Sequence, residues 1–459
     1  MHPRLRAALP EGKSSRVLAA SVALGVAVGF VLSVFEYLTL NVAFDRLAEL
    51  PLGARAIAPM FGLGATVLLL RFVGGPGTTP STSDEYVNAY HARNPSLPFR
   101  LLPVRLLAGV TTIGSGGALG LEGPSIYTGS TLGLHIYQRL DRWLGKGAAK
   151  MLLTAGAAAG VAAIFQTPAT GVVFALEAPY RDDLAHRALL PALLASASSY
   201  ITFISMPFID PKPLLGLVVA QGVGAGDLIA AVAIGIGAGV GGRAFAHLTR
   251  RAKLISKETS PVVLVVVGGL LLGALAVVSD RLFGEPLTLG PGVGSVEWLT
   301  SDRSVRLVAL LFVFRAMATL VTVGSSGVGG LFIPLAVQGV LLGRLVGVSL
   351  EQIGISPEGV RLLPFLGLAA FLAAGYRTPL AAVMFVAEST SGNAVVPALI
   401  AAAVSQLVAG KHSVTAGQRV ERLGHLEERF TLPVAAALTT DVLTVPSDAT
   451  ISEFVWIHA

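Results

Sequence analysis

One carboxylate stands in an otherwise uncharged, glycine-rich stretch of this sequence. Glu122 lies between Gly120 and Gly123 and is followed closely by Pro124. Glycine permits tight backbone turns, and proline suits the first turn of a helix because its missing N–H is no loss there. The exposed N–H groups of a helix N-terminus favour a negative charge. These residues therefore predict an acid held at the mouth of an anion-attracting helix end.

The same pattern returns 210 residues later in the chain. Residues 114–133 and 324–343 share nine identities without a gap, and Thr167, Pro168, Phe174 and Glu177 recur as Thr378, Pro379, Phe385 and Glu388. Single matches between glycines mean little in a glycine-rich chain, but this many matches at almost one offset indicate a duplicated unit. Phe332 occupies the position that Glu122 holds in the first copy, so the acid belongs to one half only.

The composition is that of a polytopic membrane protein. Of 459 residues, 53% are hydrophobic and 13% are charged, whereas soluble domains carry about 25% charged residues. Runs long enough to span a bilayer occur at residues 17–38, 189–206, 228–246, 262–278 and 305–323. Gly and Pro interrupt the runs at 161–176 and 362–386. Broken segments at matching places in two halves point to a substrate site near the bilayer midplane.

Several kinds of site are excluded or disfavoured. The chain has no cysteine, which excludes disulfides, thiolate metal sites and cysteine nucleophiles. Its histidines lack metal-ligand spacing, so we expect no metal. We also expect no cofactor and no nucleic-acid partner. A structural acid is the alternative reading of Glu122, but an ionisable residue in a membrane segment is more often functional. An intramembrane enzyme using Glu122 and a serine is a remote alternative, because neither motif has a histidine or lysine base nearby.

The two motifs together resemble those of the CLC family of anion channels and anion/proton antiporters. Residues 120–124 read Gly-x-Glu-Gly-Pro and residues 330–334 read Gly-x-Phe-x-Pro. The resemblance runs from about residue 17 to residue 418. It implies an all-α polytopic membrane protein, a CLC-type inverted repeat of tilted, partly broken helices, and a homodimer in membrane lipid. The implied function is transport of chloride or a similar small anion through a glutamate-gated pathway, with protons as a second substrate of an antiporter.

We expect four parts along the chain. Residues 1–14 form a cytoplasmic leader, residues 15–225 the first membrane repeat and residues 226–430 the second. Residues 431–459 are a linker and the truncated start of a CBS domain, which the tail from about residue 440 resembles. Arg4, Arg6, Lys13 and Arg16 precede the first apolar run. By the positive-inside tendency they place the N-terminus in the cytoplasm, so we expect a multi-pass protein of the cell membrane.

The resemblance assigns roles to individual positions. Glu122 would be the gating and proton glutamate, whose carboxylate occupies the anion site or swings out when it is protonated. The amides of Leu331 and Phe332 would donate to the central anion, and those around Gly123 would serve an outer site. Ungapped counting back from residues 102–105 puts the family's selectivity serine at Ser81.

Other positions depart from the family pattern. A gapped alignment would put Pro76 instead of Ser81 at the serine position, which leaves nitrate and bicarbonate as alternatives to chloride. Residues 410–418 contain no tyrosine, so Thr415 or the preceding valine takes the place of the family's inner tyrosine. Ala178 stands where antiporters commonly carry a second, proton-handling glutamate. A passive anion channel without proton coupling is therefore the second interpretation.

Two further groups of polar residues have weaker signals. Hydroxyl residues after Pro80, followed by Asp84 and Glu85, fit the start of a helix, although on the residues alone we favour an ordinary surface loop. Glu177 and Glu388 recur at matched positions of the two halves. We interpret both as caps or partners at helix ends.

Overall fold

The computed structural model describes residues 12–75, 78–80, 82–145, 147–210, 224–299, 303–352, 354, 362–390 and 394–422. The chain divides into a unit Met1–Val420 and a unit Glu421–Ala459, and the structure described below is that of the first unit. The predicted linker and CBS start at 431–459 lie outside the described residues, as do Ser81 and Pro76.

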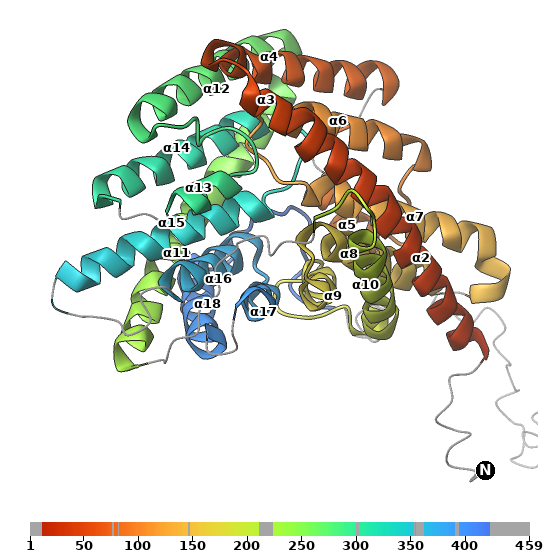
Figure 1. Ribbon diagram of the computed structural model, residues 1–459. Coiled ribbons are helices and arrows are strands. Elements are labelled where there is room, and N and C mark those ends of the chain that lie inside the picture. The colour runs from red at the N-terminus through yellow and green to blue at the C-terminus, as the bar shows by residue number, and fades with distance from the viewer. Residues whose placement is uncertain are drawn as a thin grey trace, which may run out of the picture. The chain divides into compact units, whose positions relative to one another are not determined.

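Almost all of the described chain is helical (Figure 1). The helices of the first half are α2 (Gly12–Tyr37), α3 (Asp45–Glu49), α4 (Leu52–Leu68), α5 (Thr82–His91), α6 (Leu102–Gly114), α7 (Glu122–Leu144), α8 (Ala148–Phe165), α9 (Pro168–Glu177) and α10 (Leu189–Ile204). Those of the second half are α11 (Ala225–Glu258), α12 (Pro261–Phe283), α13 (Val293–Trp298), α14 (Val305–Gly324), α15 (Phe332–Gln352), α16 (Leu363–Tyr376), α17 (Pro379–Ser389) and α18 (Val395–Ala409).

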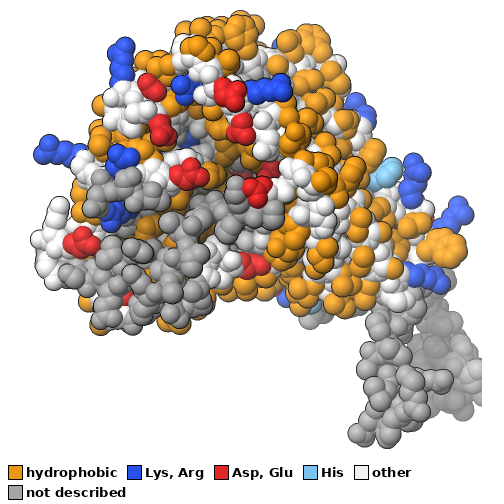
Figure 2. Space-filling model, viewed as in Figure 1, with side chains coloured by type: hydrophobic (Ala, Val, Ile, Leu, Met, Phe, Trp, Pro, Cys, Tyr) orange, Lys and Arg blue, Asp and Glu red, His pale blue; other side chains and the backbone are white. Residues whose placement is uncertain are grey.

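Within the described residues, eight helical segments are long and apolar enough to cross a membrane. The five runs that the sequence predicts as spans all overlap with such segments. The other three are Leu52–Val73, Ala148–Phe165 and Phe332–Gln352. Apolar side chains cover much of the face in Figure 2, with several Lys and Arg side chains projecting from its edge. The chain is therefore a multi-pass membrane protein, as its composition predicts.

The helices of the two halves correspond around the two motifs. α6 to α10 match α14 to α18 in order, at an offset close to 210 residues. The chain breaks at the same place in each half, just before α9 and α17 begin at Pro168 and Pro379. The breaks contain Gln166 and Arg377, whose φ angles of 54° and 59° are left-handed. The predicted duplication and the predicted broken helices are confirmed, whereas the limits 15–225 and 226–430 remain a prediction.

Equivalent threonines join the two halves. The N–H of Ala118 donates to the hydroxyl of Thr322 at 3.1 Å, and the N–H of Val328 donates to the hydroxyl of Thr112 at 3.0 Å. Each bond maps onto the other when 210 is added to or subtracted from the residue numbers. The two motif loops are therefore fixed to one another by reciprocal bonds, which is the contact expected of two copies related by pseudo-twofold symmetry.

The stretch after Pro80 is a helix, so the surface loop that we favour on local grounds is wrong. Asp84 and Glu85 lie in the first turn of α5, where negative charge is stabilised by the helix dipole. Glu85 pairs with the buried guanidinium of Arg105 on α6, and Asp84 pairs with Lys253 on α11. Both cations come from distant parts of the chain, and local sequence does not reveal them.

Candidate functional site

The two glycine-rich motifs meet through their backbones. The N–H of Gly120 donates to the carbonyl of Gly330 at 2.9 Å, and the N–H of Gly330 donates back to the carbonyl of Gly120 at 2.7 Å. This antiparallel bridge brings the starts of α7 and α15 together. A Cβ added to Gly120 would lie 2.0 Å from Oε2 of Glu122, and one added to Gly330 would lie 2.1 Å from its Cδ. The glycines thus leave the space that the carboxylate fills.

Glu122 is fully buried at the first position of α7. Its Oε1 accepts a hydrogen bond from the N–H of Phe332, the first residue of α15. The backbone N–H groups of Ile333 and of Glu122 itself also face the carboxylate. Its Oε2 accepts no hydrogen bond from the part of the chain that the structure describes. The carboxyl group of Glu122 therefore lies at the helix N-terminus of the opposite repeat, with one oxygen that can take a proton without breaking a bond.

The other predicted site residues lie around this contact. Gly123 is buried next to Glu122 in the first turn of α7. The N–H of Leu331 donates to the hydroxyl of Tyr376 at 3.2 Å. The ring of Phe332 is buried against other aromatic rings, the nearest of which is Phe165 with a centroid separation of 4.4 Å. The amides of Leu331 and Phe332, which the family resemblance predicts to be a pair of donors, thus each meet a side-chain oxygen.

A cavity of about 460 Å³ leads to this point. Both Leu331 and Thr415 line it, so the structure brings these two predicted residues together. Its other walls come from α5 and the residues before it, the first motif, α11, the end of α14, the second motif, the end of α16 and the segment after α18: Thr79, Pro80, Ser83, Asp84, Glu85, Asn88, Leu119, Arg250, Lys253, Leu254, Ser256, Lys257, Val323, Gly327, Gly329, Gly330, Tyr376, Val414 and Ala416.

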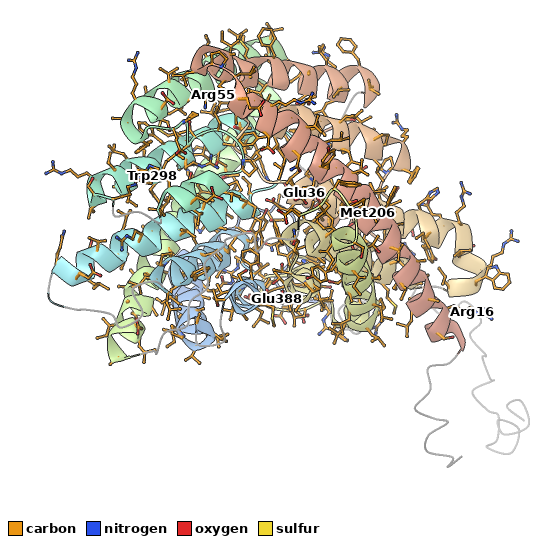
Figure 3. All side chains as sticks on the ribbon, viewed as in Figure 1. Arg16, Glu36, Arg55, Met206, Trp298 and Glu388 are labelled. Atoms are coloured by element: carbon orange, nitrogen blue, oxygen red, sulfur yellow. The ribbon has the colours of Figure 1, made fainter. Side chains whose placement is uncertain are left out.

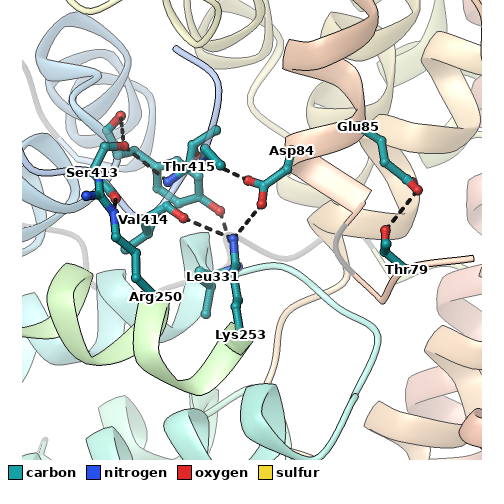
Figure 4. A network of polar contacts seen from close by, with 11 residues as sticks. Thr79, Asp84, Glu85, Arg250, Lys253, Leu331, Ser413, Val414 and Thr415 are labelled. Atoms are coloured by element: carbon teal, nitrogen blue, oxygen red, sulfur yellow. Dashed lines mark hydrogen bonds and ion pairs between the residues drawn. The ribbon is translucent and has the colours of Figure 1, made fainter. Parts of the chain in front are cut away.

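An ion pair joins three of these walls (Figure 4). The ammonium group of Lys253 on α11 donates to Asp84 of α5 at 2.7 Å and to the carbonyl of Val414 at 3.0 Å. The other oxygen of Asp84 accepts the N–H of Ala416 at 3.0 Å. Because Asp84 neutralises Lys253, this part of the wall is polar without presenting an unbalanced charge that would hold an anion tightly.

Glu177 and Glu388 cap helices of opposite repeats. Glu177, at the end of α9, accepts the N–H groups of Leu380 and Ala381 at the start of α17, at 3.1 and 2.9 Å. Glu388, near the end of α17, accepts the N–H groups of two residues at the start of α9, at 2.9 and 2.6 Å. Figure 3 labels Glu388 on its helix. The predicted helix-end role of both glutamates is confirmed.

Tyr376 is the cavity residue that sequence reasoning misses. It ends α16 and lies beside the interrupting Arg377, in a position where no motif marks it. The one signal in the sequence is its position just before the break that both repeats share. The first repeat has Phe165 at the equivalent position. The sequence thus marks the helix break but gives no reason to expect that a hydroxyl there reaches the second motif.

Comparisons with known proteins agree with this geometry. Residues 61–410 match the voltage gated chloride channel family. The chain is 28% identical over 423 residues to the H(+)/Cl(-) exchange transporter ClcA of Vibrio parahaemolyticus, an alignment that covers 86% of this chain and 87% of that protein. It is 26% identical over 365 residues to the putative chloride channel protein ClcB-like of Ralstonia nicotianae, covering 78% of this chain and 83% of that protein.

Solved structures share the fold. A slow cyanobacterial Cl-/H+ antiporter superposes with a TM-score of 0.75 at 22% identity, covering 86% of this chain and 96% of that chain. A CLC-type fluoride/proton antiporter superposes with a TM-score of 0.73 at 23% identity, covering 88% and 98%. Since the family match extends over most of the sequence and includes both motifs, this chain belongs to the voltage-gated chloride channel, or CLC, family.

Proposed function

We propose that this protein carries chloride or a similar small anion across the membrane in exchange for protons, and that Glu122 is the gate. The observation that carries this proposal is the Glu122 carboxylate, buried at the N-terminus of α15 with the Phe332 N–H as its donor. A small anion needs the same donors. Carboxylate and anion therefore compete for one site, and protonation of Glu122 decides which of them holds it.

The donor chemistry suits transport better than tight binding. An anion inside a membrane is costly unless fixed donors replace its water. A helix N-terminus offers about +0.5 of a charge, enough to attract an anion without trapping it as a buried full charge would. Residues 114–133 and 324–343 contain neither Lys nor Arg. We prefer transport to the remote alternative of an intramembrane enzyme, because the relatives are named as transporters and channels.

The cavity is the proposed approach for the anion on one side. Its wall carries Arg250, Lys253 and Lys257 from the end of α11. Basic residues are concentrated on the cytoplasmic side of membrane proteins, so we place the cavity mouth there, on the same side as the predicted N-terminus.

The cell membrane location and the homodimer remain predictions from the family resemblance. Exposed apolar side chains on α10, α11 and α18 are suitable for contact with lipid or with a second subunit.

Ala178 favours a second candidate, the passive anion channel. It stands where the family resemblance predicts a proton-handling glutamate. An alanine side chain cannot carry a proton, and the carbonyl of Ala178 accepts a hydrogen bond from Gln418 at 2.9 Å. We place the antiporter first because Glu85 lines the cavity, with one carboxylate oxygen that accepts no hydrogen bond from the described residues, and can pass protons through water from that side. The named H(+)/Cl(-) exchange relatives support the same order.

Proteoliposomes test the proposal and separate its two forms. Vesicles loaded with chloride and diluted into chloride-free medium are expected to release chloride and to drive protons uphill, measured with chloride and pH electrodes. Rapid chloride release with a silent pH electrode would establish the channel instead. Absence of flux for chloride, fluoride, nitrate and bicarbonate, in protein that is monodisperse, would contradict anion transport itself.

Glu177→Ala is expected to affect stability and leave gating unchanged. The substitution removes two hydrogen bonds to a charged acceptor, worth about 1.5–3 kcal/mol each before relaxation. Thermal unfolding in detergent should therefore occur at lower temperature than for the wild type or for Glu49→Ala, which changes an exposed glutamate. The flux that remains should keep its wild-type dependence on pH. If the dependence of flux on pH disappears while the unfolding temperature is unchanged, Glu177 handles protons, and its assignment as a helix cap alone is wrong.

A further inference from the structure

Tyr376 stands at the inner end of the cavity. It is the last residue of α16 and only 2% exposed, yet it lines the cavity together with Gly330 and Leu331. Its hydroxyl accepts the N–H of Leu331 at 3.2 Å. Its ring packs against Phe174, with centroids 5.5 Å apart. A bulky side chain with one polar atom thus fills the point where the cavity meets the second motif.

The next donor along the backbone lies beyond this point. Leu331 belongs to the cavity wall, whereas Phe332 and Glu122 are buried and do not belong to it. Two successive N–H groups at the start of α15 are therefore occupied by two different side chains, the first by the Tyr376 hydroxyl and the second by the Glu122 carboxylate. An anion arriving through the cavity meets the tyrosine before it can reach the site of the carboxylate.

The hydroxyl has the chemistry to bind an anion as well as to block it. A phenol oxygen accepts one hydrogen bond and still has its own proton to donate, which in Tyr376 faces the side chain of Ser83. An anion can replace the oxygen at the Leu331 N–H and accept that proton after a small rotation of the ring. Unlike the ionised carboxylate of Glu122, the protonated phenol carries no charge, so it does not repel the anion that it meets.

The backbone around Tyr376 is tied to the segment where the sequence lacks a tyrosine. The carbonyl of Tyr376 accepts bonds from the hydroxyl of Ser413 at 3.3 Å and from the amide of Gln418 at 3.2 Å. The carbonyl of Gly375 accepts the N–H of Val414 at 2.8 Å. Residues 410–418 therefore pack directly on the end of α16, and the aromatic hydroxyl next to this segment comes from α16.

We propose that Tyr376 forms the inner gate of the anion pathway and donates its hydroxyl to the bound anion, a role that residues 410–418 cannot supply with a tyrosine of their own. The inference rests on the proposed anion transport. It adds a second side chain that competes with the anion at the N-terminus of α15. Tyr376 acts on the side of the cavity, whereas Glu122 acts at the next N–H, beyond the cavity wall. Thr415 then belongs to the cavity wall and is not the gate.

Two substitutions separate the hydroxyl from the ring. Tyr376→Phe keeps the ring and removes the donor, so the chloride dissociation constant measured by calorimetry in detergent should rise about fivefold, the effect of one hydrogen bond. Tyr376→Ala also removes the plug, so chloride efflux from proteoliposomes should accelerate and fewer protons should move per chloride. Tyr86→Phe is the matched control, because this buried hydroxyl bonds the carbonyl of Ala175 at 2.6 Å and does not line the cavity.

The outcomes distinguish this inference from the proposed function. Wild-type protein that neither binds nor transports chloride, fluoride, nitrate or bicarbonate defeats anion transport, and this inference with it. Wild-type transport together with unchanged chloride affinity in Tyr376→Phe and unchanged coupling in Tyr376→Ala defeats the role of Tyr376 alone. An equal loss of affinity in Tyr86→Phe would assign the effect to general packing and would also overturn the proposal.

Discussion

Glu122→Gln is expected to abolish the dependence of anion flux on pH. In the wild type, lowering the pH protonates the carboxylate, which then releases the donors at the start of α15 and lets the anion in, so flux rises as pH falls. Glutamine has the same shape but no charge at any pH, so the variant should transport at the fast rate throughout. At high pH its flux should exceed that of the wild type by about tenfold or more, the value of a hydrogen bond to a charged group.

The same variant should lose proton coupling, because no carboxyl group at the site can carry the proton. Chloride and pH electrodes on one proteoliposome preparation measure both effects. Glu36→Gln is the control, since it removes another acid, half-buried on α2, that does not line the cavity (Figure 3). Flux that still rises as pH falls in Glu122→Gln would remove this residue from the gate.

Gly129→Leu is expected to prevent α7 and α8 from packing. A Cβ at Gly129 would lie 1.9 Å from the carbonyl oxygen of Gly156 on α8. The second repeat uses the same contact, because a Cβ at Gly339 would lie 2.3 Å from the carbonyl oxygen of Gly367. Small residues allow such close approach of helices in membranes. Overpacking a site bounded by backbone costs about 3 kcal/mol or more, a large share of an ordinary stability of about 5–15 kcal/mol.

The yield of monodisperse protein after size-exclusion chromatography, and its thermal unfolding temperature, measure this effect. Gly53→Leu makes the same change in helix α4 at a position with no neighbouring atom within 4 Å of the added Cβ. It is expected to express and unfold like the wild type. Normal yield and unfolding temperature for Gly129→Leu would mean that the α7–α8 contact is looser than described.

Much of the fold could be predicted because duplication repeats its local signals. Two copies of a motif at one offset identify the helix starts at Glu122 and Phe332. Two Thr-Pro pairs identify the breaks before α9 and α17, since proline begins a helix readily and interrupts one already formed. Long apolar runs identify the spans. Each of these signals lies within a short stretch of chain, so no knowledge of distant contacts is needed.

The rest of the site depends on distant contacts that local sequence does not encode. Asp84 contacts Lys253, which lies 169 positions away in the chain. This contact helps to stabilise the start of α5 in a stretch where local sequence favours a loop. Tyr376 reaches Leu331 from another helix, 45 positions away. The contact between Glu122 and Phe332 joins residues 210 positions apart and could be predicted in part. The alignment of the two repeats pairs the residues, but only the folded chain places the carboxylate of one on the amide of the other.

The most direct test of competition between carboxylate and anion is a crystal structure of Glu122→Ala grown in bromide. Removing the side chain leaves the N–H of Phe332 without its acceptor and opens the space bounded by Gly120 and Gly330. We expect an anomalous bromide peak within hydrogen-bond distance of that N–H, and no peak there in wild-type crystals whose carboxylate is in place. An empty position in the variant, or bromide bound there beside an unmoved wild-type carboxylate, would contradict the competition on which this mechanism depends.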